Sequence, residues 1–271
     1  MNVREIYVKT ILSKSKLPES TYSINPYVGC PHGCIYCYAR FMGRYTSHKE
    51  KWGEYLDIKI NGASILKKDL QRIRLKDKDV VLLSSVTDPY PPIERKYRLT
   101  RSILEVLLEH QIPISILTKS VLVLRDIDLL SRFNNCEVGL TIITLNEQVS
   151  KVFEPRAPSP YKRLEALKVL HEHNIKTYGF IGPILPCFTN LEEIFTNLRG
   201  IADTVMAESL NIKCGNWNDI QAALKSNFPS FYKEFLTKVM DETYWDKIGE
   251  KLVKLSNKFC IPLRGYYRHQ R

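Results

Sequence analysis

The sequence lacks any apolar run approaching the ~20 residues that a membrane span requires. Its opening segment, MNVREIYVKT, also lacks the apolar stretch of a signal peptide. Glycine and proline are few, with 12 and 14 residues among 271, and no internal repeat or low-complexity tract occurs. These absences exclude fibrous and disordered proteins. We therefore expect a cytoplasmic protein without membrane association.

The residues that are present are typical of a soluble globular protein. Hydrophobic residues make up 44% of the chain and charged residues 25%, enough for one large core. The net charge of +11 favours phosphate-rich partners, although a solvated basic surface is the commoner cause of such a surplus. Seven cysteines, an odd number, argue against a complete disulfide framework. They favour reduced thiols with a chemical task.

Three of the seven thiols fall within eight residues. Cys30, Cys34 and Cys37 have the spacing C-x3-C-x2-C, in the segment NPYVGCPHGCIYCYAR. Gly29 and Gly33, with a proline between them, oppose a regular helix or strand here. The segment is therefore predicted to be a compact loop that turns its thiolates toward one point, as a metal centre requires.

Two metal centres are compatible with such a loop. A closed zinc site needs four protein ligands, and no second C-x2-C follows, although His32 is a candidate fourth ligand. If the loop held zinc, the chain would be a zinc-stabilised nucleic-acid-binding protein without catalytic activity. An iron–sulfur cube held by three thiolates instead leaves one iron free for a substrate or cofactor. Its open position favours catalysis.

The C-x3-C-x2-C spacing, with an aromatic residue, Tyr36, directly before the third cysteine, resembles the signature of radical S-adenosylmethionine (SAM) enzymes. Similarity to the spore photoproduct lyase family, often labelled DNA repair photolyase-like, extends from about Thr21 to Pro186. This similarity is based on four sequence segments: TYSINPYVGCPHGCIYCYAR, SSVTDPYPPIE, LTKSVLVLRDIDLL and EPRAPSPYKRLEAL. The resemblance implies a partial (β/α)6 barrel, a [4Fe-4S] cluster on Cys30, Cys34 and Cys37, SAM as cofactor, and an electron donor such as ferredoxin or flavodoxin.

Short apolar runs alternate with segments of helical spacing, which by itself indicates an α/β fold with a parallel sheet. Strands are expected over residues 79–86, 112–118, 136–143, 175–181 and 203–210, with a weaker one over 22–28 that Pro26 interrupts. After Trp217 only helical segments are evident. We expect an N-terminal extension over 1–20, a radical SAM core over 21–215 and a helical C-terminal region over 216–271.

Polar residues at the predicted carboxyl ends of strands are candidates for holding the cofactor. The resemblance assigns cofactor contacts to Thr87, Lys119 and Thr141. From the residues alone, Thr87 also suits a turn before a proline and Thr141 suits an inward strand position.

Four further residues are candidates for contact with the cofactor or substrate on weaker grounds. The resemblance places Tyr36 beside the adenine of the cofactor. Glu154 and Arg156 form either an ion pair or a cofactor or substrate contact on a proline-rich loop. Gly182 is a candidate neighbour of adenine because glycine permits a close backbone approach.

One departure from the lyase pattern concerns its hydrogen-donor thiol. The matching position here is Ser85, whose O–H bond is far stronger than an S–H bond, so repair of a thymine dimer is in doubt. Cys136, Cys187 and Cys214 lie near predicted strand ends and are candidate replacements, although a lone cysteine is more often a small buried hydrophobe. The role of Cys260 is open.

The C-terminal segment RGYYRHQR keeps nucleic acid among the candidate substrates. It interleaves Arg264, Arg268 and Arg271 with Tyr266 and Tyr267, a composition that suits phosphate contacts and base stacking. A frayed basic terminus explains the same composition equally well.

Overall fold

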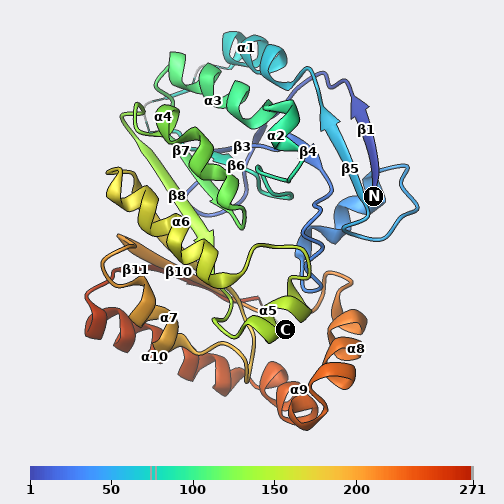
Figure 1. The fold of residues 1–271 in the computed structure, drawn as a ribbon, viewed down its shortest axis with the longest axis vertical. Coiled ribbons are helices and arrows are strands. Elements are labelled where there is room, and N and C mark those ends of the chain that lie inside the picture. The colour runs from blue at the N-terminus through green and yellow to red at the C-terminus, as the bar shows by residue number, and fades with distance from the viewer. Residues whose placement is uncertain (74, 77, 270–271) are drawn as a thin grey trace.

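The computed structural model describes residues 1–73, 75–76 and 78–269. Most of the chain surrounds an eight-stranded sheet (Figure 1). In spatial order its strands are β11 (Leu263–Tyr267), β10 (Thr204–Ser209), β9 (Lys176–Ile184), β8 (Cys136–Thr141), β7 (Ile114–Thr118), β6 (Val81–Leu83), β3 (Tyr22–Ile24) and β2 (Leu12–Lys14). All neighbours are parallel except β2 and β3, which are antiparallel. The sheet is open, because its edge strands β2 and β11 are not paired with each other.

A second, three-stranded sheet flanks the first. It contains β1 (Asn2–Ile6), β5 (Tyr55–Lys59) and β4 (Tyr27–Val28), with β5 in the middle. β1 runs parallel to β5 and β4 antiparallel to it. Because the cysteines directly follow β4, this small sheet fixes where the cysteine loop begins.

Helices connect the parallel strands. They are α1 (Gly62–Arg72), α2 (Glu94–Tyr97), α3 (Leu99–Glu109), α4 (Ile127–Leu130), α5 (Glu147–Phe153), α6 (Pro160–Glu172) and α7 (Leu191–Leu198), with 3₁₀ helices η1 (Tyr38–Tyr45) and η2 (Val121–Asp126). The C-terminal helices are α8 (Trp217–Asn227), η3 (Pro229–Phe231), α9 (Tyr232–Met240) and α10 (Glu242–Phe259). α6 packs on β8 and β9, and α10 packs on α7 and β11. No described helix is long and apolar enough to span a bilayer.

The α/β fold predicted from the sequence is confirmed. Each of the five strong strand predictions coincides with one strand from β6 to β10, and the weaker one splits at Pro26 into β3 and β4. The expectation that only helices follow Trp217 is wrong, because β11 returns to the sheet beside β10. The boundaries of the three proposed regions stay a prediction.

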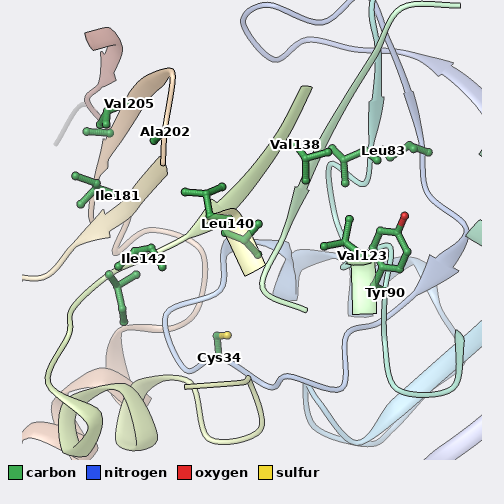
Figure 2. Close-up of a cluster of buried hydrophobic side chains, with 14 of the residues drawn as sticks. Cys34, Leu83, Tyr90, Val123, Val138, Leu140, Ile142, Ile181, Ala202 and Val205 are labelled. Atoms are coloured by element: carbon green, nitrogen blue, oxygen red, sulfur yellow. The ribbon is translucent and has the colours of Figure 1, made fainter. Parts of the chain in front are cut away.

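One buried cluster of apolar side chains occupies the interior. Strand residues such as Leu83, Val138 and Leu140 are fully buried in it. Figure 2 shows Cys34 of the cysteine loop drawn with the same cluster. The apolar core therefore includes Cys34, and Cys37 packs against it.

Candidate functional site

Cys30, Cys34 and Cys37 lie on the loop between β4 and η1, at the carboxyl ends of the parallel strands. Backbone bonds from Gly33 N to Cys30 O and from Cys37 N to Cys34 O, each 3.2 Å, make two successive tight turns. Cys30 and Cys34 are buried and Cys37 is half-buried. All three line one cavity, whereas their role as metal ligands stays a prediction.

Glycine is required at two places in this loop. Gly29 and Gly33 have φ of +88° and +62°, in the left-handed region that disfavours side chains. A Cβ at Gly29 would lie 2.5 Å from the carbonyl oxygen of Tyr55, and one at Gly33 would lie 2.3 Å from Nη2 of Arg156. The chain therefore folds tightly here because these positions carry no side chain.

Arg156 holds the cysteine loop from outside. Its Nε donates to the carbonyl oxygen of Pro31 at 2.6 Å, and its Nη2 donates to that of Gly53 at 2.8 Å. The guanidinium thereby joins the cysteine loop to the segment before β5. The ion pair of Arg156 with Glu154, one of two alternatives left open by the sequence, is not formed, and Arg156 binds backbone carbonyl oxygens instead.

Burial controls the protonation of the three thiols. Burial, the Asp88 carboxylate and the neighbouring thiols raise the pKa of Cys30 well above its usual range. Burial also raises the pKa of Cys34 to about 12 and raises that of Cys37. The free thiols are therefore protonated at neutral pH, and a metal that binds them must displace their protons.

His32 and Asp88 connect the loop to the ends of β6 and β7. The Nε2 atom of His32 lies 3.2 Å from Oδ2 of Asp88, which also accepts from the backbone N of Lys119 at 2.9 Å. Burial opposes ionisation of Asp88, but His32 and these hydrogen bonds outweigh it and lower its pKa to about 2. His32, the candidate fourth zinc ligand, is thus directed at a carboxylate. In the described part of the chain, no group of three or more His, Cys, Asp or Glu residues is arranged to hold a metal ion.

Five of the six residues predicted to contact the cofactor line the same cavity as the thiols. They are Tyr36, Thr87, Lys119, Thr141 and Gly182. Tyr36 belongs to the cysteine loop, and the others lie at or near the carboxyl ends of β6, β7, β8 and β9. The hydroxyl of Thr87 donates to the carbonyl oxygen of Gly29, so this residue also fastens the cysteine loop to the large sheet.

Glu154, the sixth predicted residue, lies behind the lining. Its carboxylate accepts a hydrogen bond from the Tyr36 hydroxyl and is paired with Arg163 in a fully buried ion pair. The ammonium of Lys119 is 3.9 Å from the same carboxylate and 5.6 Å from the Tyr36 ring centroid. Burial disfavours the charged carboxylate, but Arg163 and Lys119 outweigh it and lower the pKa of Glu154. Glu154 therefore orients Tyr36 and Lys119.

The structure adds residues to this cavity that sequence reasoning missed. They are Trp52, Phe180, Glu208, Ser209, Asn211 and His269. Glu208 and Ser209 end β10, so the strand-end rule applied to Thr87 would have found them. Trp52 and His269 offered no such signal, because Trp52 lies in an irregular segment and His269 follows the unpredicted strand β11.

A second cavity adjoins the first and is lined by residues of β6 to β10. The two share eight residues: Tyr38, Ser84, Ser85, Leu117, Phe180, Glu208, Asn211 and His269. Tyr178 and Tyr267 add two further aromatic rings to the second cavity. No Lys or Arg is among the described residues that line it. Ser85, which matches the lyase thiol position, lies where the two cavities meet.

None of the other four cysteines is among the residues that line either cavity. Cys136 begins β8 and so lies at the amino end of the sheet, opposite the site. Cys187 and Cys214 follow the carboxyl ends of β9 and β10, and Cys260 is exposed at the end of α10. Burial and the nearby Cys37 raise the pKa of Cys214 to about 11. The proposed replacement of the lyase thiol by Cys136 is therefore wrong.

The C-terminal arginines are engaged by carboxylates. Arg264 is paired with Glu137 and Glu19, and Arg268 with Asp246 and Glu242. Arg271 lies outside the described residues. Residues 263–267 form β11, so this part of the segment is not frayed.

Comparisons with known proteins agree with this geometry. The family model of the radical SAM superfamily matches residues 24–195. An uncharacterised protein of Methanocaldococcus jannaschii is 37% identical over 99% of this chain and 98% of its own length. An uncharacterised protein of Acidianus two-tailed virus is 32% identical over 91% of this chain and 82% of its own.

Solved structures share the fold at low identity. Spore photoproduct lyase complexed with a dinucleoside spore photoproduct has a TM-score of 0.67 and 16% identity, covering 98% of this chain and 82% of the lyase. Streptococcus suis SuiB bound to SAM has a TM-score of 0.57 and 12% identity, covering 99% of this chain and 50% of SuiB. These likenesses concern the fold alone.

Proposed function

The chain belongs to the radical SAM superfamily, and we propose that it is an enzyme in which Cys30, Cys34 and Cys37 hold a [4Fe-4S] cluster that binds SAM. When bound and reduced, this pair of cofactors supplies a 5'-deoxyadenosyl radical that abstracts hydrogen from a substrate. The observation that carries the proposal is that three thiols of one loop line one cavity at the carboxyl ends of a parallel sheet.

The chemistry of the donors fits such a group, although the three thiols of the described chain are not gathered around the position of a single ion. Thiolate sulfur is the usual ligand of iron–sulfur clusters. Three buried polar atoms of cavity residues have no hydrogen-bond partner among the described residues: Nε1 of Trp52, Oγ of Ser84 and Nε2 of His32, of which only the last lies beside a carboxylate. Buried polar atoms without partners are rare and costly. They support a ligand with hydrogen-bonding atoms in this cavity.

The roles of individual residues follow from their positions. Tyr36, Thr87, Lys119, Thr141 and Gly182 are proposed to contact SAM, since they line the cavity beside the thiols. Lys119 contributes the positive charge that a carboxylate of SAM requires. Glu154 is proposed to act at one remove, by holding the hydroxyl of Tyr36 and the ammonium of Lys119 in place.

We propose that the substrate enters the second cavity, which adjoins the thiol cavity. Its tyrosines and Phe180 suit an apolar or aromatic group. Nucleic acid stays a candidate substrate because of the net charge of +11 and the fold shared with spore photoproduct lyase. Without lysine or arginine in the described lining, phosphates would remain outside this cavity. We also propose a cytoplasmic location and a reductant such as ferredoxin or flavodoxin.

Substitution of single cysteines tests the cluster. The Cys34→Ala variant, purified without oxygen, should lose iron and sulfide and the ability to form 5'-deoxyadenosine from SAM. Cys260→Ala is the matched control, because Cys260 is exposed and distant in sequence from the loop. It should keep both. Equal iron content in the two variants, or one zinc in place of iron in the unaltered chain, would contradict the assignment.

A further inference from the structure

Trp52 lines the thiol cavity and carries a buried hydrogen-bond donor. Its Nε1 is buried and has no partner among the described residues, while the residue lines the cavity together with Cys30, Cys34 and Cys37. An indole N–H can only donate. A buried donor without an acceptor costs free energy, so the cofactor-free chain bears a penalty that a bound acceptor removes.

The position of this donor is fixed from several sides. Trp52 lies in a tight turn closed by a 3.0 Å bond from Glu54 N to Lys51 O. Its ring meets Tyr55 edge to face, with centroids 6.2 Å apart and an interplanar angle of 83°. The next residue, Gly53, is held by Arg156 through its carbonyl oxygen. The donor is therefore oriented before any ligand arrives, which reduces the entropy lost on binding.

The same turn abuts the cysteine loop. A Cβ at Gly53 would lie 2.8 Å from the Cα of Gly33, and both glycines contact the guanidinium of Arg156. Trp52 therefore approaches the cavity from the side of the cysteines, whereas Ser84 borders the second cavity as well. This position favours an acceptor in the group that the thiols would hold over an acceptor in the substrate.

We propose that the Nε1–H of Trp52 binds the cofactor, donating a hydrogen bond to an anionic acceptor held at the cysteine loop. This inference rests on the proposed function. A cluster sulfide and the carboxylate of SAM share the required acceptor chemistry. A bond to a sulfide stabilises the reduced cluster and raises its reduction potential. A bond to the carboxylate strengthens SAM binding.

The experiment compares Trp52→Phe with the unaltered chain in three measurements. The cluster midpoint potential is titrated without SAM, the SAM dissociation constant is measured by equilibrium dialysis on the cluster-loaded chain, and the cofactor-free chain is unfolded in urea. If the acceptor is a sulfide, the potential becomes more negative. If it is the carboxylate, SAM affinity falls about 10-fold. In both cases the urea midpoint of the cofactor-free chain does not fall, since no internal hydrogen bond is lost and an unpaired buried donor is removed.

Trp245→Phe is the matched control. The Nε1 of Trp245 already donates to the carbonyl oxygen of Val239 at 3.1 Å, and the ring is buried away from the site. This variant should unfold at lower urea and keep the potential and the SAM affinity. The inference fails if Trp52→Phe shifts neither cofactor measurement, or if it lowers the urea midpoint as Trp245→Phe does. A chain that forms no cluster at all would contradict the proposed function itself.

Discussion

At the scale of single residues, the site depends on glycines, which have no side chain, as much as on the thiols. Gly33 and Gly53 allow the guanidinium of Arg156 to lie against the backbone of two loops. The two hydrogen bonds of Arg156 then hold the cysteine loop beside the turn that carries Trp52. Substitution at Gly33 should therefore disturb the site even though no ligand atom is removed.

Gly33→Ala is expected to destabilise the chain more than Gly200→Ala. Both glycines have a positive φ, +62° and +77°, so both variants incur about 1 kcal/mol of backbone strain. Only Gly33 meets Arg156, whereas a Cβ at Gly200 has nothing within 4 Å. Displacing Arg156 should cost about 2 kcal/mol more and lower the iron content. Urea unfolding measures the difference, and equal losses in the two variants would refute this role of Gly33.

The sequence predicted the thiols and five of the residues that line the cavity beside them, but not the hydrogen bonds that hold the cysteine loop. Ligand spacing is a local property of the sequence. Three cysteines within eight residues therefore indicate a common ligand even when the fold is unknown. The bonds of Arg156 join residues 125 and 103 positions apart. No local pattern specifies such partners. For the same reason the sequence left open whether Glu154 pairs with Arg156, and it did not indicate Arg163 on α6 as the partner of Glu154.

At the scale of elements, the strands that were predicted correctly are those with apolar runs in their own sequence. β6 to β10 carry apolar residues in runs, which matches their position inside the sheet. β11 reads LRGYY and has neither an apolar run nor alternation, and it exists because β10 offers a free edge. Tertiary pairing thus created a strand that local preference did not indicate.

Edge strand β2 is held by a side chain of a helix. Asp69 on α1 accepts hydrogen bonds from Ile11 N at 2.8 Å, Leu12 N at 3.1 Å and the Thr10 hydroxyl at 2.9 Å. Burial of Asp69 alone would raise its pKa, but these bonds outweigh burial and lower it. The carboxylate form is therefore favoured in the folded chain.

Asp69→Asn should change how stability depends on pH. Because the pKa of Asp69 is lowered on folding, its contribution is present above its unfolded pKa of about 3.9 and is lost as the pH falls through the lower folded value. The variant should be less stable by about 1 kcal/mol at pH 7. The difference should shrink as the pH falls below 4. Urea unfolding at pH 7, 4 and 3 checks this, and a constant difference would contradict it.

At the scale of the whole molecule, an ion pair between side chains connects the two edges of the open sheet, which share no backbone hydrogen bonds. β2 and β11 are its two edges, and Arg264 on β11 pairs with Glu19, which follows β2. Arg264 also pairs with Glu137 on β8 and lies 5.5 Å from the Tyr178 ring centroid. Glu19, Glu137 and Tyr178 line the second cavity. The guanidinium thereby links residues on several sides of the space proposed for the substrate.

Arg264→Gln should loosen this bridge without unfolding the chain. Arg264 is half-buried, so solvent screening limits the loss to about 1–2 kcal/mol. Hydrogen exchange should accelerate in β2, in residues 15–20 and in β11, while β7 and β8 stay protected. Arg268→Gln is the control, because its partners Asp246 and Glu242 lie on the exposed side of α10. Unchanged exchange at both edges in Arg264→Gln would show that the edges are held together by other contacts.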